Sequence, residues 1–247
     1  MTSPTEASRR ILQPLENARV PWWKRSIDLV WCVAALPFFL CAAVLVAALA
    51  SLNSPGPIFF IQERIGYRGQ KFRLYKFRTM HLHAESTRHQ LHFAELVSSN
   101  APMQKLDAKG DVRLIPGGSW LRATGIDELP QIINVLRGEM SLVGPRPCIP
   151  YEYNQYSARQ RDRFATVPGL TGLWQVSGKK RTTLDEMIRL DIEYAHRRSL
   201  WLDLGIILGT LPAIVLQVWD QRRVRKNVRV AATFSPGPSV PLPQTAR

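Results

Sequence analysis

The sequence predicts a mainly α-helical protein of the α+β class, with one small β-hairpin and an N-terminal helix embedded in a membrane. Three observations lead to this prediction. An uncharged apolar run covers residues 29–52, two β-like runs flank Gly66 and Gly69, and several later segments repeat apolar residues at helical spacing. The chain of 247 residues is long enough for one substantial domain with appendages.

The charge of the chain indicates anionic partners, because the formal net charge is +14. Such a protein attracts nucleic acid, phospholipid headgroups or phosphorylated substrates. No RNA- or DNA-reading motif is found, so no nucleic-acid partner is expected. The three cysteines have no paired spacing, and they are expected to be small hydrophobic residues in a reducing compartment.

The apolar run of residues 29–52 is long enough to cross a bilayer and too long for a cleavable signal peptide. Basic residues flank it on both sides, and the positive-inside rule places both flanks in the cytoplasm. Pro37 removes a helix hydrogen bond and can act as a hinge. Two forms remain open: a re-entrant hairpin that dips into one leaflet and returns, or a proline-kinked spanning helix.

Residues 58–80, IFFIQERIGYRGQKFRLYKFRTM, predict the β-hairpin. In its second half the apolar residues are interleaved with the cations Lys71, Arg73, Lys76 and Arg78. These cations either form a solvated face or bind phosphate beside the membrane segment.

Residues 124–147, TGIDELPQIINVLRGEMSLVGPRP, are the most informative stretch. A helix is predicted from near Asp127 to near Arg137, because an apolar stripe recurs there at helical spacing: Leu129, Ile132, Ile133 and Leu136. Pro130 is tolerated only in a first turn, and Gly138 is a natural stop.

Asp127 and Glu128 stand at the mouth of that helix and have two interpretations. Asp127 can be an ordinary N-cap, and Glu128 an ordinary first-turn acid that favours the helix dipole. Alternatively, the same helix mouth attracts phosphate, and a carboxylate placed there can attack phosphorus. Adjacent helical residues point in different directions, so one acid can attack while the other holds a metal.

Two arginines lie close to these acids in the sequence. Arg122 precedes Asp127 by five residues, and Arg146 is locked between two prolines. Together with the acids they indicate a site that handles phosphate. The glycines of residues 167–181, VPGLTGLWQVSGKKR, either let backbone N–H groups approach a ligand or serve ordinary turns.

The remaining elements are predicted from weaker patterns. Residues 151–164 are expected to be helical, as are residues 182–195, where Thr183 caps the helix and Glu186 completes a capping box. The apolar stretch 200–219 is expected to lie in the membrane interface or to pack on the domain.

These elements divide the chain into four parts. Residues 1–23 are expected to form a loose leader, and residues 24–54 the membrane-embedded helix. Residues 55–220 are expected to form the main domain, and residues 221–247 a basic and then proline-rich disordered tail.

Taken together, these segments resemble the bacterial sugar transferase family, the monotopic phosphoglycosyl transferases. The resemblance runs from about Lys24 to Val218 and is carried by several motifs in the family's order: KRSIDL, SPGPIFFIQERIG, YKFRTM, LRATGIDELPQIINVLRGEMSLVGPRP, VPGLTGLWQVSGKKR and LDIEYAHRRSLWLDL. It implies a monotopic membrane protein with an N-terminal re-entrant helix broken at Pro37 and interfacial amphipathic helices.

The resemblance also implies a reaction. Sugar 1-phosphate would pass from a UDP-sugar to polyprenyl (undecaprenyl) phosphate with release of UMP, by a ping-pong mechanism and with Mg²⁺ as cofactor. Asp127 matches the family's nucleophile, which forms a covalent phospho-sugar intermediate, and Glu128 matches its metal-associated partner. Arg122 and Arg146 match phosphate-positioning arginines. We expect Lys76 and Arg78 of YKFRTM to bind substrate with them.

Two positions depart from the family's pattern. Its helix break is often Ser-Pro, whereas Leu36 precedes Pro37 here. Many members have arginine after the glycine of the QVxG motif, where this chain has Lys179, which keeps the charge of that substrate contact but loses the bidentate fork.

The expected location is the bacterial inner membrane, among its phospholipids, with the catalytic domain on the cytoplasmic face. The expected role is the first membrane step of surface polysaccharide or glycoconjugate synthesis. The sugar, the pathway and the oligomeric state, including a homo-oligomer, are left open. The competing interpretation is a non-catalytic, membrane-anchored basic adaptor that binds anionic lipid, a role that does not require the acidic pair.

Overall fold

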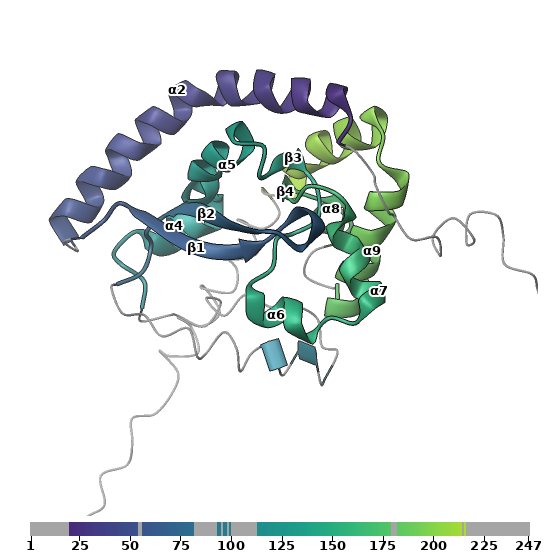
Figure 1. Ribbon diagram of the computed structural model, residues 1–247. Helices are drawn as coiled ribbons and strands as arrows, with labels where there is room; N and C mark the ends of the chain where they lie inside the picture. Colours follow the sequence, from purple (N-terminus) through teal and green to yellow (C-terminus); the bar gives the residue numbers. More distant parts are fainter. Residues whose placement is uncertain are drawn as a thin grey trace, which may run out of the picture.

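The computed structural model describes residues 20–53, 56–81, 113–178 and 182–213, with isolated positions 93, 94, 96, 97, 99 and 215. One long helix, α2, arches over a domain of short helices and two small sheets (Figure 1). This agrees with the predicted α+β class, mainly helical with one small hairpin.

Helix α2 (Trp22–Asn53) contains Pro37 and continues through it. The helix bends over the domain but does not fold back on itself (Figure 1). The predicted segment therefore forms one bent helix and not a hairpin of two arms, since a single lost hydrogen bond bends a helix without reversing it. Among the described residues, this helix has the length and composition to cross a membrane.

One stripe of α2 faces the domain along most of its length. Its members recur at helical spacing and are buried or packed against the domain's core: Lys24, Asp28, Cys32, Ala35, Phe39, Ala42, Ala43 and Val46. At about 1.5 Å per residue the helix is about 48 Å long. Its other faces expose large apolar side chains, among them Val30, Val33, Phe38 and Val44.

The predicted hairpin is confirmed. Strand β1 (Phe59–Ile65) pairs antiparallel with β2 (Lys71–Phe77), and the short 3₁₀ turn η1 (Tyr67–Gly69) joins them. Leu74 of β2 packs against Ile132 and Val135, which places the hairpin beside the acidic segment. The strand that carries Lys76 is thereby fixed against the residues around Asp127.

The predicted helix at residues 127–137 is only half right. Helix α4 (Gly118–Thr124) ends at Gly125, whose φ of 77° is left-handed. A 3₁₀ helix, η3 (Ile126–Gln131), follows, and the α-helix α5 (Ile132–Leu136) begins only after Pro130, which has no N–H to give an α-helical bond. Leu136, assigned to the apolar stripe, is exposed instead.

The glycines after residue 166 serve backbone packing. Strand β3 (Ser141–Val143) pairs in parallel with β4 (Gly169–Thr171), just before the short helix α8 (Leu173–Val176). A Cβ atom on Gly169 would lie 2.0 Å from the backbone nitrogen of Gly144, and one on Gly144 would lie 2.3 Å from the oxygen of Val167. Glycine is therefore required where these two backbones meet.

The predicted helix at residues 151–164 is broken into three short ones: α6 (Pro150–Gln155), α7 (Ala158–Arg161) and the 3₁₀ helix η4 (Asp162–Ala165). The break falls where Ser157 caps α7. Helix α9 (Leu184–Arg197) begins as predicted, with the Thr183 hydroxyl accepting from the N–H of Glu186. A last helix, Leu200–Ala213, follows.

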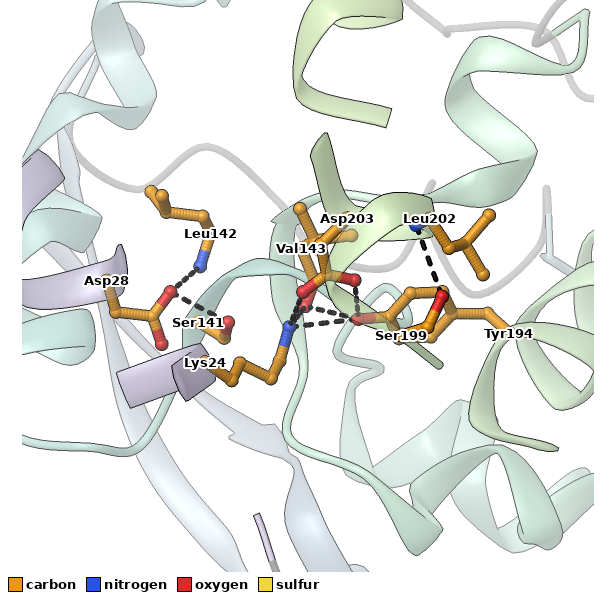
Figure 2. Close-up of polar contacts among 9 residues, drawn as sticks. All are labelled: Lys24, Asp28, Ser141, Leu142, Val143, Tyr194, Ser199, Leu202 and Asp203. Atoms are coloured by element: carbon orange, nitrogen blue, oxygen red, sulfur yellow. Dashed lines mark hydrogen bonds and ion pairs between the residues drawn. The ribbon is translucent and has the colours of Figure 1, made fainter. Parts of the chain in front are cut away.

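A buried polar network fastens the start of α2 to the domain (Figure 2). The Lys24 ammonium donates to Asp203 Oδ2 at 2.6 Å, to the Tyr194 hydroxyl at 2.9 Å and to the carbonyl of Val143 at 2.7 Å. One turn later, Asp28 accepts hydrogen bonds from the Ser141 hydroxyl and the Leu142 N–H. The first turns of α2 are thus tied to β3, α9 and the last helix together.

Candidate functional site

The acidic pair lies in η3, against strand β2. Asp127 is buried, whereas Glu128 is partly exposed and receives the Lys76 ammonium at 2.8 Å. Gly125 precedes the pair as the N-cap, and its carbonyl accepts from the N–H of Glu128. Asp127 is therefore not the N-cap, as one interpretation of the sequence held. It lies inside the first turn of η3, beside a carboxylate paired with a lysine.

The predicted arginines around the pair have different environments. Arg122 is half-buried in the last turn of α4, the helix that leads directly into η3. Arg78 is buried, and its Nε donates to the carbonyl of Pro57 at 2.8 Å. Arg78 thus joins the end of the hairpin to the turn after α2. This contact is structural, whether or not Arg78 also binds substrate.

Arg146 is exposed, but its backbone carbonyl is bonded to a buried ion pair. Arg163 of η4 and Asp191 of α9 pair with each other, and both side chains are almost fully buried. Arg163 donates to the carbonyl of Arg146 at 3.0 Å, which ties this backbone to the pair. Burial outweighs the neighbouring cations and raises the pKa of Asp191 to about 6.

Three groups of residues around the site were missed by the sequence analysis: Arg64 on β1, the pair Arg163 and Asp191, and the Lys24 network. Only one of these had a local signal. Lys24 and Asp28 are two charges one helical turn apart at the start of an apolar helix, which indicates a polar stripe on one face. Lys179 lies outside the described residues.

The side chains that could bind a metal show which kind of magnesium site the structure allows. In the part of the chain that the structure describes, no group of three or more histidine, cysteine, aspartate or glutamate side chains gathers as a metal cage. Mg²⁺ commonly binds through one or two carboxylates, with phosphate oxygens and water completing its shell. The partly exposed carboxylate of Glu128, beside Asp127, fits a site of that kind, which substrate would complete.

Fold and site together define a protein with a long apolar N-terminal helix and an acidic pair that a lysine contacts. Residues 19–217 match the model of the bacterial sugar transferase family, so the chain belongs to that family. A UDP-glucose:undecaprenyl-phosphate glucose-1-phosphate transferase of Caulobacter vibrioides is 40% identical over 211 residues, which cover 82% of this chain and 73% of the relative.

Two further relatives differ in length. The galactosyl transferase CpsE of Streptococcus agalactiae is 39% identical over 195 residues, and the exopolysaccharide production protein ExoY of Rhizobium meliloti is 35% identical over 193. Each match covers 78% of this chain, but it spans 42% of CpsE and 85% of ExoY. The chain thus spans less than half the length of some curated relatives that it matches.

Proposed function

We propose that this protein transfers a sugar 1-phosphate from a UDP-sugar to polyprenyl phosphate and releases UMP. The observation that carries the proposal is the pairing of buried Asp127 with Glu128, which Lys76 contacts at 2.8 Å, in a segment flanked by Arg122. The family and the names of relatives such as the Caulobacter glucose-1-phosphate transferase support it.

In the proposed reaction, a carboxylate oxygen of Asp127 attacks the phosphorus that carries the sugar. The bond from that phosphorus to the bridging oxygen breaks, and UMP leaves with the electron pair. A phosphate oxygen of the polyprenyl acceptor then attacks the same phosphorus, which releases the Asp127 carboxylate and forms the polyprenyl diphosphate sugar. Two displacements at one nucleophile imply ping-pong kinetics.

Lys76, Arg122 and Arg146 bind and orient the phosphates in this proposal, because phosphoryl transfer depends on positioning and charge neutralisation. Glu128 would hold Mg²⁺, and the chemistry supplied by the bound ion is neutralisation of charge on the phosphate oxygens. Lys76 already pairs with Glu128, so the same lysine is placed to move to an incoming phosphate.

The proposed location is the cytoplasmic face of the inner membrane, with α2 embedded in one leaflet. Its stripe from Lys24 to Val46 packs on the domain while its other faces are apolar and exposed, so both halves of the helix stay on the domain's side of the bilayer. The last helix exposes Trp201, Leu208 and Leu211, which suits an interfacial position.

The test is UMP release by the detergent-solubilised protein from a panel of UDP-sugars with polyprenyl phosphate and Mg²⁺. Asp127→Asn should lower transfer by about a thousandfold or more, as expected for loss of a nucleophile. Asp185→Asn is the matched control, since Asp185 is an exposed acid in the first turn of α9. It should leave the rate unchanged.

Binding to vesicles that contain anionic phospholipid separates this proposal from the adaptor. Both Asp127→Asn and the wild type should bind, since the apolar faces of α2 are unaltered. A wild-type protein that binds vesicles but releases no UMP from any sugar would favour the adaptor. An Asp127→Asn variant with a near wild-type rate would refute the nucleophile assignment.

A further inference from the structure

Arg64 is a buried arginine whose charge is incompletely matched. Its side chain sits in the last part of β1, and the residue is 8% exposed. Nη2 donates to Gln62 Oε1 at 2.7 Å, but Nε and Nη1, both covered from solvent, have no hydrogen-bond partner among the described residues. Buried polar groups are usually satisfied, so two unpaired guanidinium nitrogens require an explanation.

The register of the hairpin places Arg64 on the face that meets the acidic pair. Arg64 lies opposite Phe72, and Phe60 lies opposite Lys76. Because alternate residues of a strand share a face and opposite residues stand side by side, Arg64 and Lys76 lie on the same face of the hairpin. Lys76 reaches Glu128 from that face.

The end of β1 also meets the turn that carries Arg146. The N–H of Ile65 donates to the carbonyl of Cys148 at 2.8 Å, which joins the residue after Arg64 to the chain just beyond Arg146. The charges are close enough to interact. Burial and the nearby Arg146 lower the pKa of Arg64 to about 10, against the opposing effects of Glu152, Cys148 and Glu128.

Two guanidinium groups brought together by the fold repel each other unless an anion lies between them. We propose that Arg64, together with Arg146, forms a phosphate subsite beside Glu128, with the unpaired nitrogens of Arg64 as its inner donors. This inference rests on the proposed function and adds a substrate-binding residue to it. The phosphate belongs either to the diphosphate of the nucleotide sugar or to the polyprenyl monophosphate.

The arrangement suits a phosphate better than a purely structural arginine. The charge of the buried Glu152 acts on Arg64, but this carboxylate accepts no hydrogen bond from Nε or Nη1 of Arg64. A planar fork binds two phosphate oxygens at once, and such charge-assisted bonds are strong where water is excluded. Nε and Nη1 of Arg64 are covered, so a phosphate reaches them only when neighbouring side chains move. Arg146 is exposed and is therefore one side chain that can move.

The test measures thermal stabilisation of the detergent-solubilised protein by two probes, UDP and a short-chain prenyl phosphate. The variants are Arg64→Met and Arg64→Lys. The matched control is Arg73→Gln, because Arg73 is exposed on the other face of the same hairpin. A ligand that binds the folded state raises Tm with its concentration, so the titration gives an apparent affinity without any turnover.

We expect Arg64→Met to keep or raise the Tm of the ligand-free protein, since it removes unpaired buried donors, and to weaken one probe by about tenfold or more. Arg64→Lys should weaken the same probe by an intermediate factor, and Arg73→Gln should match the wild type. Loss with UDP assigns the subsite to the donor, and loss with prenyl phosphate assigns it to the acceptor.

Two results would overturn the inference. One is an Arg64→Met variant that binds both probes within twofold of the wild type. The other is an Arg64→Met variant with a lowered Tm alongside an Arg64→Lys variant that binds both probes normally, which would make Arg64 structural. A wild type that binds both probes but transfers no sugar would count against the proposed function alone.

Discussion

Two lysine–carboxylate ion pairs of the molecule differ in how far they are buried. Lys24 and Asp203 pair at 2.6 Å with side chains that are 2% and 4% exposed, whereas Lys76 and Glu128 pair at 2.8 Å with side chains that are 24% and 43% exposed. Lys24 has three acceptors around its ammonium. The second pair stands open to solvent at the candidate site.

This difference in burial predicts different roles: the buried pair stabilises the fold, whereas the lysine of the partly exposed pair can change its anionic partner. A buried and fully hydrogen-bonded pair is strongly destabilised when one partner is removed, because a charge is left without compensation in the interior. A partly exposed pair contributes little to stability, and its lysine can leave one anion for another. We therefore expect the first pair to hold α2 on the domain and, under the proposed function, the lysine of the second pair to move to a phosphate.

The largest effect on stability is expected at the fastening pair. Asp203→Ala should lower the free energy of unfolding by about 3–5 kcal/mol, because it leaves Lys24 buried without its carboxylate. The double variant Lys24→Met with Asp203→Leu should recover most of that loss. Thermal unfolding in detergent measures both. Equal stability of Asp203→Ala and the wild type would show that this pair does not fasten the helix.

A smaller, pH-dependent effect is expected at Asp191, whose pKa is raised from 3.8 to about 6 in the folded protein. A raised folded-state pKa stabilises the fold at low pH, and that contribution is lost as pH rises through the folded pKa. Relative to Asp191→Asn, the wild type should therefore be more stable at pH 4 than at pH 8, by up to about 3 kcal/mol. A constant difference between the two proteins across this range would contradict the raised pKa.

The smallest effect on stability is expected at the exchanging pair. Lys76→Met should change the free energy of unfolding by no more than about 1 kcal/mol, while transfer falls by at least about tenfold. Lys71→Met is the matched control on the same strand, since Lys71 pairs with Glu63 at 2.9 Å in an exposed position. It should change neither quantity. A strongly destabilised Lys76→Met variant would show that the Lys76–Glu128 pair stabilises the fold as the buried pair does.

The elements that local sequence specifies were predicted well. The hairpin follows from two β-like runs joined at glycines, and the start of α9 follows from the capping residue Thr183 and its partner Glu186. The adjacent acids Asp127 and Glu128 are also a local signal; they lie together in η3, and their role as the centre of the site stays a prediction. Such signals depend on residues a few positions apart.

The elements that depend on distant contacts were missed. The parallel pair of β3 and β4 requires Gly144 and Gly169 to meet backbone to backbone, and no local pattern distinguishes that contact from a turn. The 3₁₀ geometry before Ile132 was missed for a local reason, because the apolar repeat runs across Pro130, whose missing N–H cannot give an α-helical bond. Ion pairs such as Arg163 with Asp191 join residues whose proximity only the fold creates.

The link between Lys24 and Asp203 also constrains how the protein is made. The two residues are 179 positions apart, and synthesis at about 5–20 residues per second separates their emergence by roughly 10–40 s. Until Asp203 emerges, the lysine of the nascent α2 lacks its carboxylate, and its other two acceptors, Val143 and Tyr194, follow it by 119 and 170 positions. If α2 meets the bilayer during synthesis, that encounter is therefore governed by the composition of the helix itself, before its carboxylate partner has been made.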